Sequence, residues 1–300
     1  PAGPALVAPA NGATGVNTQN PVALSWSAAS DSTSYTIEVA TDAGFANIVA
    51  TQASQSGTSW NVSGLQSLTT YYWRVRANNI CGAGANSPVF NFKTAQAPGA
   101  CGENQTANVL FSDDIEGSVS GWTTSAGTGS QTWAVSSARP SSPTKSWLAT
   151  DVTTASDQRL VSPAVALPTG QSPLSLSYQS DLNLEPRTAG GCYDGGLLEI
   201  STNDGGTWTQ ITGAALLTDP YTGAANGGAA NGLQVWCGTR PYKKSVVDLD
   251  SYAGQTVRFR FRVSTDSSQG LTPHGWYVDD VRVQSCSSGP TDRLFADGFQ

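Results

Sequence analysis

The sequence predicts an all-β protein built from two domains. Short stretches in which apolar and polar residues alternate recur along the whole chain, and clusters of Asn, Gly, Asp and Ser separate them. The 3.6-residue periodicity of amphipathic helices is nearly absent. A length of 300 residues exceeds one average domain, so each half can bury a core of its own.

Composition narrows the classes of function. Charged residues make up 12% of the chain, and its formal net charge is −7. Because binding to phosphate backbones needs clustered Lys and Arg, this balance argues against a nucleic-acid partner and makes calcium a more natural one. No apolar run reaches 18 residues, so no membrane span is predicted. The chain has no Met and does not begin with a signal peptide, so we expect a piece of a longer protein.

The cysteine pattern favours disulfides. There is no Cys-x-x-Cys motif and a single histidine, which disfavours a structural zinc site and favours an oxidising compartment. Cys101 and Cys286 bracket the second domain where its first and last strands should meet, and Cys192 with Cys237 would form a second bridge. This scheme leaves Cys81 unpaired, and a Cys81–Cys101 bridge is the alternative.

Residues 5–95 predict a β-sandwich, with Leu24 and Trp26 facing inward on its first clear strand. The run from Leu65 to Tyr71 places a leucine, a turn and a strand-initiating tyrosine in the order of a tyrosine corner, whose phenol returns to the backbone. On these motifs the stretch resembles a bacterial fibronectin type III domain, which implies a spacer or adhesion role. We assign residues 1–97 to this domain.

The remaining boundaries follow from composition and strand pattern. Residues 98–108 are polar, contain Pro and Gly, and are predicted to be a linker. Residues 109–286 contain about eight short strands, enough for a jelly-roll β-sandwich. Residues 287–300 form a C-terminal tail.

A hairpin motif lies inside the second domain. The segment Ser201-Thr-Asn203-Asp-Gly205-Gly-Thr207-Trp208 fits the Asp-box pattern, with Asn203 where aspartate usually stands. We expect Gly205 to adopt a positive φ, Ser201 and Asn203 to bond the turn backbone, and Trp208 to pack beneath. The motif predicts structure and not catalysis.

Clustered acids predict a metal site. Alternation over the last strand places Asp279 on one face with Tyr277, Val281 and Val283. A carboxylate in such a row needs a cation or several donors. The opening strand of the domain ends in a second acidic cluster, so adjacent first and last strands would create a divalent-cation site at their seam.

The second domain resembles the jelly-roll domains, related to MAM and immune-inhibitor-A C-terminal domains, that are appended to secreted bacterial metallopeptidases. The motifs that carry the likeness include Asp113-Asp-Ile-Glu116, Tyr193-Asp-Gly-Gly196 and Gly275-Trp-Tyr-Val-Asp279-Asp280. The resemblance implies calcium with Glu116 and Asp279 as its leading ligands.

Other roles for the acids stay open. Asp114, Asp151 and Asp280 are further candidate calcium ligands. Bonds from backbone N–H groups, or ion pairs with an arginine such as Arg159 or Arg282, would account for the same acids without a metal. Asp194 and Glu185 are candidates for a separate polar site.

Catalytic motifs are not found in the sequence. It lacks Gly-x-Ser-x-Gly and His-Glu-x-x-His, and we expect the lone His274 to be a loop residue. Trp236 and Tyr242 lie in the longest Gly- and Asn-rich loop region, so they are the predicted exposed pair that contacts a ligand.

We therefore expect a non-catalytic accessory region of a secreted bacterial hydrolase. The resemblance implies a metallopeptidase as the parent, with an upstream catalytic domain covalently linked to this region. The region would provide spacing and bind a protein or polysaccharide surface. The alternatives are a carbohydrate-binding module of a polysaccharide-degrading enzyme and a surface adhesin.

Overall fold

The computed structural model describes residues 1–268 and 275–288. His274 and residues 289–300, most of the predicted tail, lie outside these ranges. The predicted all-β class is confirmed, and the helical segments among the described residues are the short 3-10 turns η1 (Gly213–Ala215) and η2 (Asp250–Tyr252). Within the same ranges, no helix is long and apolar enough to cross a membrane.

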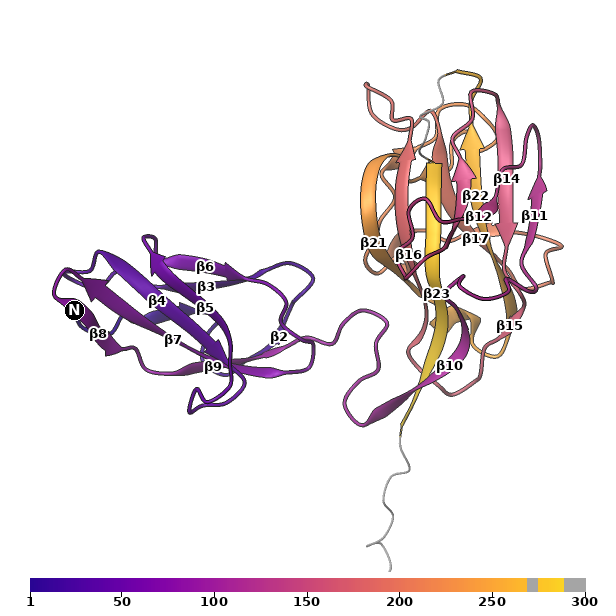
Figure 1. The fold of residues 1–300 in the computed structure, drawn as a ribbon. Helices are drawn as coiled ribbons and strands as arrows, with labels where there is room; N and C mark the ends of the chain where they lie inside the picture. The colour runs from indigo at the N-terminus through magenta and orange to yellow at the C-terminus, as the bar shows by residue number, and fades with distance from the viewer. Residues whose placement is uncertain (269–274, 289–300) are drawn as a thin grey trace, which may run out of the picture. The chain divides into compact units, whose positions relative to one another are not determined.

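The chain divides into two compact units between Ala97 and Pro98 (Figure 1). The strands of the first unit are β1 (Leu6–Ala8), β2 (Ala13–Val16), β3 (Val22–Trp26), β4 (Ser34–Ala40), β5 (Ile48–Gln55), β6 (Ser59–Val62), β7 (Thr70–Asn79), β8 (Gly82–Asn86) and β9 (Phe90–Thr94). They form one sheet ordered β1-β3-β6 and another ordered β2-β9-β7-β4-β5, with β8 beside β7.

Alternation along these strands builds the core of the first unit. Leu24 and Trp26 of β3 face inward as predicted, and they pack with Trp73 of β7. The tyrosine corner is confirmed, because the Gln66 N–H donates to the Tyr71 hydroxyl over 2.8 Å. The first unit is therefore a β-sandwich closed by a side chain to backbone bond at the start of β7.

The second unit contains the remaining strands. They are β10 (Gln105–Asp113), β11 (Thr123–Ala126), β12 (Ala134–Ser136), β13 (Ser146–Thr150), β14 (Ser156–Val161), β15 (Val165–Ala166), β16 (Leu174–Leu184), β17 (Gly195–Ser201), β18 (Thr209–Gln210), β19 (Gly223–Ala224), β20 (Gln234–Val235), β21 (Gly238–Asp248), β22 (Thr256–Thr265) and β23 (Gly275–Ser288).

Two antiparallel sheets face each other in this unit (Figure 1). One has the order β12-β13-β23-β16-β21, and β10 also pairs with β23. The other has the order β11-β14-β22-β17-β18, and β15 also pairs with β22. Aromatic rings fill the space between them: Phe261 of β22 lies 5.1 Å from Tyr178 and 5.7 Å from Trp276, measured between ring centroids.

The first and last strands of the second unit are neighbours, as predicted. Strand β10 runs antiparallel to β23, with Asp113 opposite Val281. The Cys101–Cys286 disulfide joins them near their other ends, and Cys192–Cys237 forms the second predicted bridge. Cys81 is free and exposed, so the alternative bridge to Cys101 is not formed.

The predicted linker over residues 98–108 needs correction. Cys101 already belongs to the second unit through its disulfide, and β10 begins at Gln105. This strand is half-exposed, so its polar composition is compatible with pairing to β23 and does not indicate a linker. The second unit therefore starts well before residue 109.

The predicted face of Asp279 is also wrong. Ser177 of β16 lies opposite Arg282, whereas Gln179 lies opposite Asp279, so β23 carries one extra residue between these pairs. Asp280 sits in this bulge with a φ of 50°. The bulge reverses the alternation: Trp276, Val278, Val281 and Val283 belong to the apolar core, and Asp279 with Tyr277 faces away from it.

Candidate cation site

Glu116 and Asp279, the leading predicted ligands, hold a loop. Glu116 accepts the backbone N–H groups of Thr144 and Lys145 over 2.8 and 2.7 Å, and also the Thr144 hydroxyl. Asp279 accepts the N–H groups of Ser141 and Ser142 over 2.8 and 3.1 Å. Both carboxylates therefore secure the segment between β12 and β13, in the donor-bonded role that the sequence left open.

The pKa values of the two acids differ because their surroundings differ. The Thr144 hydroxyl is the largest influence on Glu116 and lowers the pKa of this exposed carboxyl. Burial is the largest influence on Asp279 and raises its pKa, against the opposite effect of the Ser142 and Ser141 N–H groups. Their hydrogen bonds leave few carboxylate lone pairs for a metal.

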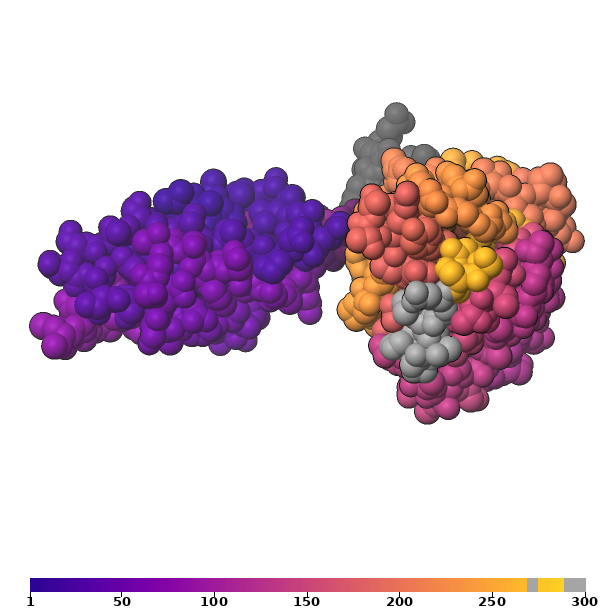
Figure 2. All heavy atoms as spheres, turned by 90° about the horizontal axis from the view of Figure 1, so that it is seen from above, coloured from indigo at the N-terminus to yellow at the C-terminus, as the bar shows by residue number. Residues whose placement is uncertain are grey.

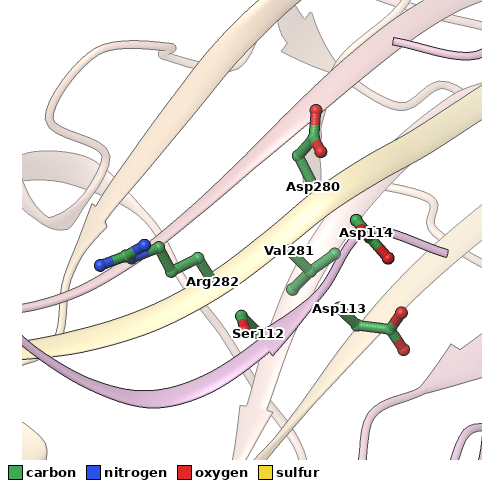
Figure 3. Close-up of a pocket in the computed structure, with 6 residues that line it drawn as sticks. All are labelled: Ser112, Asp113, Asp114, Asp280, Val281 and Arg282. Carbon is green, nitrogen blue, oxygen red and sulfur yellow. The ribbon is translucent and has the colours of Figure 1, made fainter. Parts of the chain in front are cut away.

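Asp114 and Asp280 line a shallow pocket of about 290 Å³ where β10 ends beside β23. Asp113 contributes a third carboxylate, but it accepts the Trp122 indole N–H over 2.7 Å. Figure 3 shows the three carboxylates pointing in different directions from the two strands instead of converging on one point. The structure thus places these predicted ligands near one another without assembling a chelating group.

A convergent group of acids lies at another end of the second unit. Glu185 directly follows β16, Asp194 directly precedes β17, and Asp266 directly follows β22. One carboxylate oxygen from each of these residues lies within 4.8 Å of the others. Figure 2 looks down on this end of the unit, where the salmon segment after β16 reaches the surface.

Asp151 joins this group from the end of β13. Its carboxyl is fully buried and close enough to Asp194 for a side-chain hydrogen bond, and its charge also acts on Glu185. We call Asp151, Glu185, Asp194 and Asp266 the acidic cluster. Its members follow or precede strands of both sheets, so an ion held by them would join the two layers of the sandwich.

Asp194 has the most demanding environment in the acidic cluster. It is fully buried, and its Oδ1 accepts the Asp266 N–H over 2.7 Å. Among the described residues, no N–H or hydroxyl group donates to its Oδ2. Two carboxyl groups share a hydrogen bond only when one is protonated, so contact with Asp151 requires either a bound proton or a nearby cation.

Burial and like charge raise the pKa values of Asp194 and Glu185. Burial is the largest cause for Asp194; the Asp266 N–H acts against it, the Asp151 charge adds to it, and the resulting pKa is about 8. Burial is again the largest cause for Glu185, whose pKa rises further through the charges of Asp266 and Asp151. In the described part of the chain, no lysine or arginine forms an ion pair with Glu185, Asp194 or Asp266.

These residues fit a hard divalent cation. Carboxylate oxygens are preferred calcium ligands, and two ligands on opposite sides of one ion at about 2.4 Å would be about 4.8 Å apart. Buried oxygens of Asp194 and Glu185 accept no hydrogen bond from the described residues, which leaves lone pairs for such an ion. The set contains no sulfur or imidazole ligand, as zinc would prefer.

The predicted aromatic ligand platform is not exposed. Trp236 is 2% exposed, and its ring centroid lies 4.3 Å from that of Tyr221 and 5.8 Å from that of Trp276. Backbone bonds between Trp236 and Gly196 tie its loop to β17, which buries the ring. Tyr242 is half-buried on β21, and its hydroxyl donates to the Arg139 carbonyl over 2.6 Å.

Sequence reasoning identified three members of the acidic cluster in separate roles and missed Asp266. Asp151 was assigned to the seam, and Glu185 with Asp194 to another polar site. Asp266 directly follows the strand Thr256–Thr265, and this position at a strand end is the sequence feature that could have identified it as a site residue. Nothing local in the sequence shows that these strand ends meet.

Comparisons with known proteins place the first unit in a family. The fibronectin type III domain family matches residues 8–93, so the first unit is a fibronectin type III domain. Bacillopeptidase F of Bacillus subtilis (strain 168) is 25% identical over 187 residues, a match that covers 60% of this chain. The same match covers only 11% of bacillopeptidase F, so this chain corresponds to a small part of that relative.

Matches to solved structures with low TM-scores were also found. A Fn3-like protein from Clostridium thermocellum is 24% identical, with coverage of 32% of this chain and 96% of that chain and a TM-score of 0.26. A structure of carbohydrate-binding modules from the β-sandwich superfamily is 13% identical. The match covers 94% of this chain and 98% of that chain, with a TM-score of 0.35.

Proposed function

We propose that this chain is a non-catalytic accessory region of a secreted bacterial peptidase. The fibronectin type III domain provides spacing, and the second unit is a calcium-stabilised β-sandwich that binds a substrate or a surface. The acidic cluster is the observation that carries the calcium part of this proposal. Four carboxylates from both sheets meet where burial disfavours the charge of Asp194 and Glu185, and a bound calcium ion would compensate that charge.

Two further observations support the accessory role. The two disulfides favour an oxidising, extracellular compartment. The partial match to bacillopeptidase F supports a peptidase as the parent protein. The metallopeptidase class, expected from the sequence resemblance, would be supported by a His-Glu-x-x-His motif upstream in the parent reading frame.

Calorimetric titration of CaCl2 into the chelator-stripped chain tests the metal site. We expect one calcium site, and Asp194→Asn should weaken it on the order of tenfold or more because a charged ligand is lost. Asp31→Asn is the matched control, since it removes an exposed charge in the first unit. Equal calcium affinity in both variants, or no binding by the wild-type chain, would contradict the proposed site.

The accessory role is tested on the parent peptidase with and without residues 1–300. We expect unchanged hydrolysis of a short soluble peptide and slower hydrolysis of an insoluble protein substrate when the region is removed. Equal loss on both substrates would instead place this region in the catalytic machinery.

A further inference from the structure

One sheet of the second unit carries a row of arginines, of which Arg260 and Arg262 are buried and Arg159 and Arg258 are partly exposed. Arg258, Arg260 and Arg262 alternate along β22, and Arg260 lies opposite Glu199 of β17. Arg159 of β14 lies opposite Arg262. We call Arg159, Arg258, Arg260 and Arg262 the arginine face.

Part of the arginine face is hollowed. A pocket of about 360 Å³ is lined by three of these arginines, Arg159, Arg258 and Arg260, and by Trp208 of the Asp-box hairpin. The hairpin has its predicted form, because Ser201 Oγ accepts the Gly205 N–H over 2.9 Å and Gly205 has a φ of 91°. Remaining lining residues are Thr123, Ser125, Val161, Asp204 and Gly205.

Ion pairs with acids on the neighbouring strands β14 and β17 hold the arginine face in place. Asp157 binds Arg159 over 2.6 Å, and it binds Arg262 through two contacts of 2.6 and 3.2 Å. Glu199 pairs with Arg260 and, over 3.4 Å, with Arg262. Two acids thus fix three guanidinium groups. Because these side chains are already ordered, a ligand that binds them loses less free energy to side-chain entropy.

The arginine face carries one more positive than negative charge, because its four arginines pair with three acids, Asp157, Glu199 and Asp204. Three of these arginines line the pocket, on a chain whose net charge is −7. Arg260 uses Nε for Glu199, and its guanidinium carbon lies 4.4 Å from the Trp208 ring centroid. Within the described residues, neither Nη atom of Arg260 makes a hydrogen bond, so these donors are open to an anion.

We propose that this pocket of the arginine face binds an acidic glycan through its carboxylate or sulfate groups. Guanidinium groups match the geometry of both anions, and the Thr123 and Ser125 hydroxyls can bond sugar hydroxyls beside them. This inference names the ligand class for the binding role proposed above and rests on that role. It involves none of the residues of the acidic cluster.

The geometry of the surface favours a glycan over a peptide. An extended peptide is usually bound at a sheet edge, where backbone groups pair with it, whereas this pocket offers side chains on a sheet face. A glycan has hydroxyl and acidic groups that side chains alone can satisfy.

The test is calorimetric titration of the full chain with polygalacturonate, dextran sulfate and neutral laminarin. We expect binding to at least one acidic polymer and none to laminarin, and the first two polymers distinguish carboxylate from sulfate as the bound group. Added salt should weaken the binding, because it screens the attraction between the arginines and the acidic groups, and the Debye length falls to about 3 Å near 1 M salt. Equal affinity for laminarin, or no binding to either acidic polymer, would overturn the proposal.

Variants assign the binding to this face. Arg258→Gln should weaken binding about tenfold through the loss of a charged donor. Arg282→Gln is the matched control, since Arg282 is an exposed arginine on the opposite sheet and should not affect binding. Asp204→Asn should tighten binding, because Asp204 competes for Arg258.

Outcomes for glycan and calcium are separable. Each variant is checked for folding by its urea unfolding midpoint in chelator, which does not depend on calcium binding. Equal glycan affinity in Arg258→Gln and Arg282→Gln, or weaker binding in Asp204→Asn, would contradict the site even if the chain binds calcium. Loss of calcium binding with intact glycan binding would contradict the proposed cation site instead.

Discussion

Asp194 combines full burial, a carboxyl neighbour and a buried oxygen that accepts no hydrogen bond from the described residues. Each of these features raises the free energy of its charged form. A cation reverses this effect, because the same oxygens then become ligands. At the residue scale, this carboxyl therefore links the stability of the second unit to calcium.

The raised pKa of Asp194 predicts a pH dependence in chelator. Its pKa is about 8 in the folded chain against an ordinary value of 3.8. The folded state keeps a proton that the unfolded state loses, so stability should fall as the pH rises from about 4 to about 8 and then level off. Urea unfolding of the wild type and of Asp194→Asn measures this.

The two variants share every titrating group except the Asp194 carboxyl. The difference between their free energies of unfolding, plotted against pH, therefore isolates the contribution of Asp194. We expect the wild type to lose stability relative to Asp194→Asn as the pH rises. Parallel curves across this pH range would contradict the assigned pKa.

At the element scale, the bulge in β23 decides which face Asp279 occupies. Asp280 has a φ of 50°, a conformation that aspartate and asparagine tolerate better than branched residues. Asp280→Val should therefore cost about 1–2 kcal/mol in backbone strain, in addition to the lost bond from the Ser142 hydroxyl. Asp280→Asn keeps an acceptor oxygen and should cost much less, as measured by urea unfolding. Equal losses in the two variants would mean that this backbone conformation is not under strain.

The two disulfides should differ in their contribution to stability. Cys101–Cys286 closes a loop with a sequence separation of 185, against 45 for Cys192–Cys237. The entropy of loop closure predicts a loss of about 5 kcal/mol for the long loop and about 4 kcal/mol for the short one. Urea unfolding of the two double Cys→Ser variants measures both losses of unfolding free energy. A larger loss after removal of the Cys192–Cys237 bridge than of the Cys101–Cys286 bridge would contradict this prediction.

Local sequence patterns were sufficient for the strands, the tyrosine corner at Tyr71 and the hairpin that ends at Trp208. Each depends on residues that are close in the chain. The face of Asp279 was predicted wrongly, because one extra residue at Asp280 reverses the side-chain alternation without a clear local signal.

Features that depend on distant segments were harder to predict. Trp236 was expected to be exposed because its loop is rich in Gly and Asn, yet that loop pairs back onto β17 and buries the ring. Asp151 and Asp266 lie 115 positions apart in the sequence and belong to opposite sheets. Their contribution to one cluster depends on sheet packing, which no local pattern records.

At the scale of the whole molecule, the two units have separate apolar cores. The acidic cluster belongs entirely to the second unit. Calcium should therefore stabilise one unit and leave the other unchanged. This division makes the first unit an internal reference within the same chain.

Differential scanning calorimetry with calcium and with chelator tests the central claim most directly. We expect two unfolding transitions, and calcium should raise the midpoint temperature only for the second unit. At a calcium concentration 100 times the dissociation constant, the free energy of unfolding should rise by about 3 kcal/mol, which shifts the midpoint by several degrees. Asp194→Asn should reduce this shift by about half or more, because a tenfold weaker site gains only about 1.4 kcal/mol at the same calcium concentration. Asp279→Asn should lower the midpoint but leave the calcium-induced shift unchanged. No calcium shift in the wild type, or a shift lost only in Asp279→Asn, would contradict the acidic cluster as the calcium site.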